Sequence, residues 1–175
     1  MSTIIDGSAG VTTNVGAVYN GIQTATAVAS TSGTSIDFTS IPSWVKRITV
    51  MFNGVSTSGT SNILIQIGSG SVTASGYVGS VNNANASANS AFSTGFMVLV
   101  VTAAASSAYG QITLTNITSN TWVESSSLST AAAASAGNQY SAGVLALGGA
   151  LDRVRITTVN GTDTFDAGSI NILYE

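Results

Sequence analysis

Carboxylates are the side chains in this sequence with the widest chemical use. The chain has no His and no Cys, which excludes imidazole or thiolate metal sites, a Cys nucleophile and a Ser-His-Asp relay. Asp163 and Asp166 stand in the segment 160–168, and Glu124 and Asp152 are the other candidates for a glycan-cleaving pair. A Ca²⁺ site made of Asp163, Asp166 and backbone carbonyls is an alternative, although its spacing lacks the pattern of a dedicated calcium loop. Because Asp caps turns through its own backbone, we expect Asp163 and Asp166 to hold the loop, with no catalytic role.

The four cationic side chains are Lys46, Arg47, Arg153 and Arg155. Arg153 and Arg155 alternate with apolar residues, so they share one face of an expected strand. They form either a small anion-binding patch or ion pairs, and ion pairing is the interpretation that we favour. The candidate partners are Asp152, Asp37 and Glu175.

The aromatic residues could stack on sugar rings, although packing in a core or an interface is their commoner use. Trp44 follows Pro42 at the start of an expected strand and is predicted to lie in the core. Trp122 stands beside a turn and is the better candidate for surface binding. The tyrosines that could stack on sugars are Tyr77, Tyr109 and Tyr140.

The composition limits the class of protein. The chain has 175 residues, enough for one domain, and charged residues make up 6% of it, with a net charge of −3. So few cations argue against nucleic-acid binding. Ser and Thr together number 50, so hydroxyl groups must do much of the work of keeping the surface soluble. A near-neutral surface favours association between copies.

No segment of the sequence is expected to insert into a membrane. The longest apolar stretch, residues 96–105, is interrupted by Thr102. About 20 residues are needed for a spanning helix, so this stretch fits a buried strand better. The segment 1–15 has neither a cation nor an apolar core, so no secretory signal is expected. No residue set suggests a cofactor site.

Alternation of apolar and polar residues predicts strands from about Ser35 onward. Eight or nine strands with turn signals between them, and no convincing helix, predict an all-β fold. The expected architecture is an antiparallel β-sandwich of jelly-roll type. The clearest expected strands are 44–52, 62–67, 96–102, 111–117, 121–124, 144–147, 151–159 and 169–174.

The amino-terminal part of the sequence differs from the rest. Residues 1–30 are small and polar, and we predict an extended arm followed by the sandwich at 31–175. Segments 82–90 and 125–138 are predicted to be solvent-facing loops, with a short helix as the alternative for the second. The carboxyl end is an expected strand, so by elimination the arm is the segment free to anchor the protein. Its candidate anchoring side chains are Ile4, Ile5, Tyr19 and Ile22.

Two segments carry a resemblance to a known family. Ser32–Phe52, which contains Ser-Ile-Asp-Phe-Thr-Ser-Ile-Pro-Ser-Trp-Val-Lys-Arg-Ile-Thr-Val, resembles a segment that recurs in bacteriophage tail-fibre and related virion proteins. The ending, Asp152–Thr157 followed by Asn160–Glu175, resembles the carboxyl end of the same family, and Val18–Gln23 resembles its lead-in. The two segments bracket almost all of the expected sandwich; the Ser/Ala-rich middle is not specific.

The resemblance implies a virion structural β-domain, usually trimeric, on the exterior of a phage particle, and it transfers no catalytic residue. We therefore expect a non-enzymatic, homotrimeric surface protein of the tail-fibre or receptor-binding type that contacts other virion proteins and, as an option, a host surface glycan. In the family this module often ends a longer fibre, whereas here only the short segment 1–30 precedes it. A capsid cement or head-decoration protein is therefore the first alternative, and a carbohydrate-binding or depolymerising module is the second.

Overall fold

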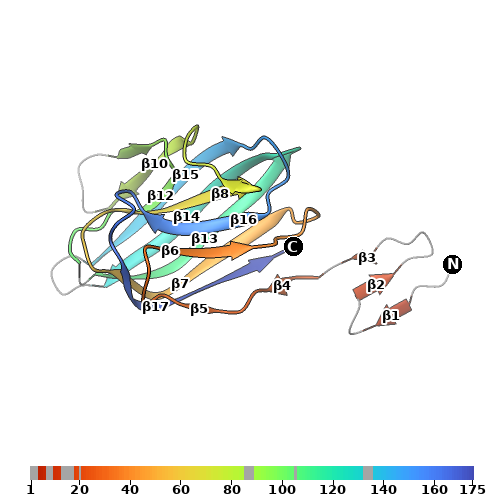
Figure 1. The fold of residues 1–175 in the computed structure, drawn as a ribbon, viewed down its shortest axis with the longest axis horizontal. Coiled ribbons are helices and arrows are strands. Elements are labelled where there is room, and N and C mark those ends of the chain that lie inside the picture. Colours follow the sequence, from red (N-terminus) through yellow and green to blue (C-terminus); the bar gives the residue numbers. More distant parts are fainter. Residues whose placement is uncertain are drawn as a thin grey trace.

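The chain forms strands throughout the described residues, and none of those residues is helical. The computed structural model describes residues 4–6, 10–12, 18–19, 21–84, 89–104, 106–131 and 136–175. Figure 1 shows the strands in order along the chain. They are β1 (Ile4–Asp6), β2 (Gly10–Thr12), β3 (Val18–Tyr19), β4 (Gln23–Thr24), β5 (Val28–Ala29), β6 (Ser35–Thr39), β7 (Arg47–Thr57), β8 (Ile63–Ser69), β9 (Ser71–Val72), β10 (Val78–Asn83), β11 (Ser90–Phe92), β12 (Phe96–Leu99), β13 (Ser107–Thr118), β14 (Thr121–Ala131), β15 (Gly137–Ala146), β16 (Arg153–Thr158) and β17 (Phe165–Tyr174).

Two antiparallel sheets make the predicted sandwich. The larger has nine strands in the order β11-β10-β15-β14-β13-β7-β17-β4, with β5 also paired to β17. The smaller has five, in the order β12-β8-β16-β6, with β9 paired to β8. The all-β sandwich is thus confirmed. The jelly-roll connectivity is not confirmed, because the consecutive strands β13, β14 and β15 are hairpin neighbours within one sheet.

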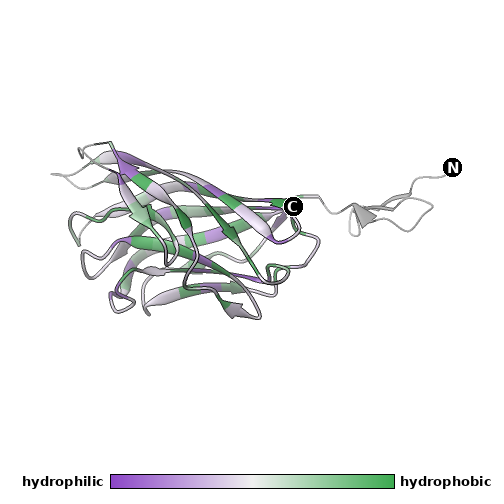
Figure 2. Ribbon diagram, turned by 90° about the horizontal axis from the view of Figure 1, so that it is seen from above, coloured by the Kyte–Doolittle hydropathy of each residue, from purple (hydrophilic) through white to green (hydrophobic). Residues whose placement is uncertain are grey.

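The core lies between the inner faces of the two sheets. On most strands of the large sheet alternate residues are buried, as for Ile112 and Leu114 on β13, whereas β8 and β12 of the small sheet are buried at successive positions. Val154 and Ile156 are the inward-facing pair on β16. Figure 2 shows hydrophobic and hydrophilic residues interspersed along the strands. Burying one such side chain contributes about 2 kcal/mol, so this stripe pattern fixes which face of each strand points inward.

Strand β14 corrects the prediction of a loop at 125–138. Residues 125–131 continue the strand, and 137–138 begin β15; residues 132–135 lie outside the described part. The Ser-rich sequence hides the strand because small hydroxyl side chains have little strand preference of their own. Its backbone hydrogen-bonds to β13 on one side and β15 on the other, and Leu128 supplies the inward-facing anchor. Of the loop predicted at 82–90, residues 82–83 and 90 are in strands, and 85–88 are not described.

Strand β7 runs through Asn53-Gly54 and ends five residues beyond the end of the strand expected at 44–52. The pairing of β7 with β13 shifts register there, with Ala108 opposite Val55 and Tyr109 opposite Asn53. Gly54 has φ +68°, a conformation that suits glycine in a β-bulge. The Asn-Gly pair therefore bends a long strand without ending it.

Strand β12, part of the stretch expected to be a buried strand, is the last strand along the order of the five-stranded sheet. All four of its residues are buried. Beyond its end, the Gln139 side chain accepts from Val100 N–H at 2.7 Å and donates to Val100 O at 2.9 Å. The amide of Gln139 thereby supplies the hydrogen bonds that a further strand would give, which protects the edge.

The amino-terminal residues are more structured than an extended arm. β1, β2 and β3 pair with one another as a small antiparallel sheet, because backbone groups can pair in strands too short to show an alternating pattern. β4 and β5 pair with β17, and Ser30 N–H donates to Gly168 O at 2.9 Å. The large sheet therefore includes residues 23–30, which the sequence assigned to the arm.

Candidate functional site

The two loop carboxylates hold the chain in place. Asp163 Oδ2 accepts from Ser61 N–H at 2.9 Å, and its Oδ1 accepts from Asn160 Nδ2 at 2.7 Å. These hydrogen bonds hold the pKa of Asp163 below its usual value. Asp166 accepts from the Ser56 hydroxyl. Among the described residues no three His, Cys, Asp or Glu side chains gather in a way that could hold a metal ion.

Glu124 is the buried carboxyl of the sandwich. It lies on the inner face of β14 with 3% of its surface exposed. Ser141 Oγ donates to Oε1 at 2.8 Å, and the Ser126 and Ser141 hydroxyls are 2.6 Å apart. Burial raises the pKa of Glu124 to about 7, against the weaker opposing effect of these hydroxyls. Within the described residues, Oε2 has no hydrogen-bond partner.

The two arginines on β16 form ion pairs, as predicted. Arg155 Nε and Nη2 donate to Asp37 at 2.7 and 3.1 Å, across from β16 to β6. Arg153 makes the same two-point contact with Asp152, at 2.7 and 3.1 Å, and this lowers the pKa of Asp152. These charges lie on the outer face of the small sheet and neutralise one another. They do not form an anion-binding patch.

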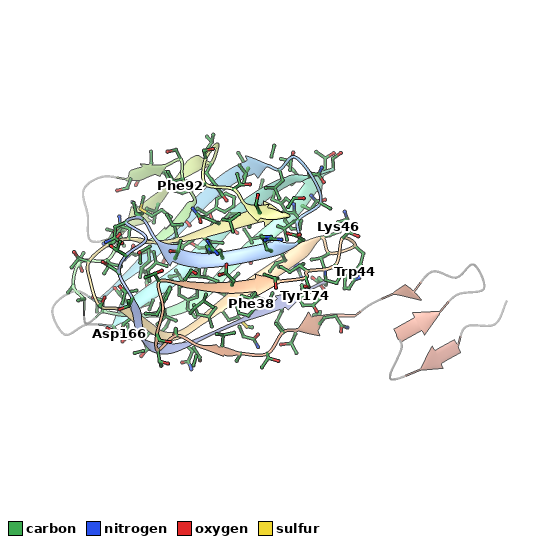
Figure 3. All side chains as sticks on the ribbon, in the orientation of Figure 1. Phe38, Trp44, Lys46, Phe92, Asp166 and Tyr174 are labelled. Atoms are coloured by element: carbon green, nitrogen blue, oxygen red, sulfur yellow. The ribbon has the colours of Figure 1, made fainter. Side chains whose placement is uncertain are left out.

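The two tryptophans lie in different environments. Trp122, the better candidate for surface binding, is instead 3% exposed, because it shares the inward parity of Glu124 and Leu128. Trp44, predicted to be core, is 38% exposed and lies before β7, with its ring centroid 6.1 Å from that of Tyr174. Figure 3 shows Trp44, Lys46 and Tyr174 near one end of the sandwich and Asp166 near the other.

The outward face of the nine-stranded sheet is a broad neutral surface, which we call the outer sheet face. Its side chains are half-buried or exposed, and most carry hydroxyl, amide or small apolar groups. Among the described residues, the charged side chains Arg47 and Glu175 lie at one end of this face, and the exposed Asp166 of β17 lies near the other end. The remaining members are Thr49, Met51 and Asn53 on β7; Tyr109, Gln111, Thr113 and Thr115 on β13; Val123, Ser125, Ser127 and Ser129 on β14; Asn138, Tyr140, Ala142 and Val144 on β15; and Asn171 and Leu173 on β17.

Strand register arranges this face in rows. Gln111 of β13 lies opposite Met51 on one side and Ser127 on the other, and Ser127 lies opposite Tyr140. Tyr109 is 43% exposed and Tyr140 48%. Two large amphipathic rings therefore lie among polar side chains on the same face of the sheet. Both tyrosines were candidates for sugar stacking from the sequence, but their position on the same face of the sheet could not be predicted from it.

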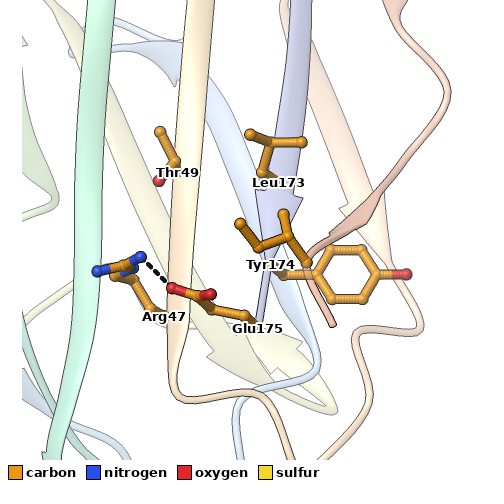
Figure 4. A pocket seen from close by; sticks show the side chains of 6 residues that line it. Arg47, Thr49, Leu173, Tyr174 and Glu175 are labelled. Carbon is orange, nitrogen blue, oxygen red and sulfur yellow. Dashed lines mark ion pairs between the residues drawn. The ribbon is translucent and has the colours of Figure 1, made fainter. Parts of the chain in front are cut away.

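A groove of about 270 Å³ lies where this face meets residue 22. Figure 4 shows its side chains. The Arg47 guanidinium pairs with the Glu175 carboxylate across its floor. Glu175 N–H donates to Arg47 O at 3.0 Å, while its own carbonyl accepts from Lys46 and Arg47 N–H. The remaining lining residues are Ile22, Thr49, Leu173 and Tyr174.

The candidate anchoring residues are placed only in part. Ile22 is 62% exposed beside this groove. Ile4 and Ile5 are in β1 and Tyr19 is in β3, but their side chains lie outside the described residues. The groove could not be predicted from the sequence, because the pairing of β7 with β17 is what brings Arg47 and Glu175 together.

Comparison with known proteins adds no relative. The described residues contain no helix of the length and apolar character needed to cross a bilayer. No protein-family model, no curated protein and no solved structure matches the chain.

Proposed function

We propose that this chain is a non-enzymatic structural protein on the exterior of a bacteriophage particle, of the tail-fibre or receptor-binding type, and that it assembles as a homotrimer. The resemblance of residues 32–52 and 152–175 to phage fibre proteins suggests the setting. The observation that carries the proposal is the neutral outer sheet face. Copies of one chain can pack on such a face without bringing like charges together.

The distribution of charge supports assembly through this face over the opposite one. The outer face of the small sheet carries Asp37, Arg155, Arg153 and Asp152 in compact ion pairs. Those groups keep water bound and resist desolvation. The outer sheet face presents mainly hydroxyls, amides and apolar groups, which are cheaper to bury when they find partners.

The assembly is tested by sedimentation equilibrium at micromolar protein. A homotrimer has three times the mass of the chain, which is 17.4 kDa. Ser127→Glu puts a charge at the centre of the outer sheet face and should dissociate the trimer. The matched control, Thr39→Glu, adds the same charge at an exposed position of β6 and should leave it intact. A stable wild-type species with the mass of a single chain would overturn the trimer.

Glycan binding by the same face is a second candidate function. Tyr109 and Tyr140 are exposed amid hydroxyl and amide groups, a combination that suits stacking on and hydrogen bonding to sugar rings. Retention of the protein on purified host polysaccharide, lost in a Tyr109→Ala, Tyr140→Ala double variant, would support it. Release of new reducing ends from that polysaccharide would instead identify a depolymerising module and contradict a non-enzymatic role.

A further inference from the structure

A second pocket opens at the end of the sandwich beside the β13–β14 turn. It is an open depression of about 310 Å³, open solvent included, between the segment that leads into β7, the turn at 119–120 and the segment before β16. Val45 and Leu151 give it an apolar side. Its polar lining residues are Ser43, Lys46, Asn116, Ser119, Asn120 and Trp122.

The charge in this pocket is positive. Lys46 lines it, and none of the lining residues is acidic. Arg47, Arg153 and Arg155 each pair with a carboxylate, whereas the ammonium of Lys46 contacts a neutral acceptor, Asn116 Oδ1, at 3.4 Å. Lys46 is thus the one cationic side chain without an ion pair among the described residues.

The neighbouring turn holds the pocket in shape. Asn116 Nδ2 donates to Ser119 O at 3.0 Å and to Thr121 O at 3.1 Å. These two bonds fix the amide with its oxygen toward Lys46. Ser119 has φ +44°, a left-handed conformation that costs a non-glycine residue about 1 kcal/mol and is commoner at binding sites than elsewhere.

One of the residues that line the pocket carries a buried donor without a partner. Trp122 lines the pocket, and its buried indole Nε1–H has no acceptor among the described residues. A buried donor without a partner is costly, so such groups call for an explanation. An acceptor atom supplied by a ligand, reached by a small rotation of the indole, would satisfy it.

We propose that this pocket binds a small ligand bearing a carboxylate, with Lys46 as the countercharge. The Trp122 indole donates to the ligand, and Val45 and Leu151 contact a short apolar substituent such as the methyl of an N-acetyl group. Acidic sugars and acylated amino acids share this chemistry. This inference does not depend on a virion location or on trimer assembly.

Nuclear magnetic resonance of the 15N-labelled full chain tests the proposal directly. The protein has two tryptophans, so the spectrum contains two indole N–H signals. A Trp44→Phe variant, changed at a half-exposed position outside the pocket, assigns the remaining signal to Trp122. The probes are N-acetylneuraminate as the acidic sugar, N-acetylalanine as the amino-acid carboxylate, and neutral N-acetylglucosamine as the control.

The expected result is a saturable shift of the Trp122 indole signal with one or both carboxylates at millimolar concentration. Lys46→Gln should weaken that binding at least about five-fold. The matched control Arg153→Gln, which removes a cation from the opposite sheet, should leave it unchanged. Tighter binding of N-acetylneuraminate or of N-acetylalanine shows whether the ligand is an acidic sugar or an acylated amino acid.

Three results would overturn the proposal. These are no shift with either carboxylate, an equal shift with N-acetylglucosamine, or binding that is the same in Lys46→Gln. The Lys46 side chain is exposed, so its variant should fold normally. An otherwise unchanged spectrum verifies that loss of binding is not loss of structure.

Discussion

Ser141 and Glu124 lie on the inner faces of the neighbouring strands β15 and β14, with Ser141 Oγ 2.8 Å from Glu124 Oε1. A carboxyl in this position meets neutral hydroxyls, and burial disfavours its charged form. The interior of the sandwich therefore holds a proton that the unfolded chain would release.

The stability of the fold should fall as the pH rises from about 4.5 to about 7. The folded protein keeps the Glu124 proton up to a pKa of about 7, whereas the unfolded chain loses it near 4.5. Between these values the folded state binds more protons, so the free energy of unfolding falls by about 3 kcal/mol and is then level. Urea denaturation at a series of pH values measures this decline.

Glu124→Gln is the matched variant for that decline, because it keeps the shape and the hydrogen bond while it removes the titration. We expect its free energy of unfolding to be nearly level between pH 5 and pH 8. The same slope in wild type and variant would show that Glu124 does not carry the effect.

Tyr77→Phe should destabilise the fold although it removes a single oxygen. The Tyr77 hydroxyl accepts from Ile67 N–H at 2.8 Å and donates to Thr73 O at 2.9 Å, inside the core. Its loss leaves a buried N–H unpaired, which costs about 1–3 kcal/mol. Chemical denaturation measures the change. Tyr109→Phe, on the exposed outer sheet face, should cost less than about 0.5 kcal/mol, and equal losses would contradict the assignment.

Gly168→Ala should lower the stability by more than about 2 kcal/mol. Gly168 has φ +91°, and an added Cβ would lie 2.4 Å from the Gly54 carbonyl group. Both glycines stand where the pairing of β7 and β17 or β13 changes register. Gly148→Ala, with open space around its Cβ, is the control and should change the melting temperature little. An unchanged stability in Gly168→Ala would mean that β17 can shift away from β7 to make room for the added Cβ.

Much of the fold could be predicted from the sequence, because large apolar residues alternate with polar residues along most strands. Residues 111–115 and 153–156 show this, since Ile112, Leu114, Val154 and Ile156 are buried and alternate with half-buried or exposed residues. The Ser-rich strand β14 was not readable, since its pairing with two neighbours replaces intrinsic preference. One signal was present: Trp122 has the same parity as Leu128, which places both on the inner face.

The surfaces were harder to predict than the strands. The Arg155–Asp37 pair was among the expected options because opposite charges in a low-charge chain tend to meet. The outer sheet face and the Lys46 pocket depend on which strands are neighbours, and residues such as Arg47 and Glu175 meet only through the pairing of β7 with β17. No local pattern in the sequence records that neighbourhood.

Deleting residues 2–21 should separate folding from attachment. The deletion retains β4 and β5, which pair with β17, so the sandwich should melt within a few degrees of the full chain. If the arm anchors the protein, the truncated form should fail to join phage particles in a complementation assay. Normal incorporation would move the anchor to the sandwich.

Electron microscopy of intact phage particles, purified from a lysate in which this chain is expressed and labelled with antibody to the sandwich domain, tests the central claim most directly. The account predicts label on the particle exterior, at the tail for a fibre. Label on the head surface would replace the fibre role with the decoration role on the same virion. If purified particles carry no label while the protein is found free in the lysate, the chain is not a virion protein and the account is wrong.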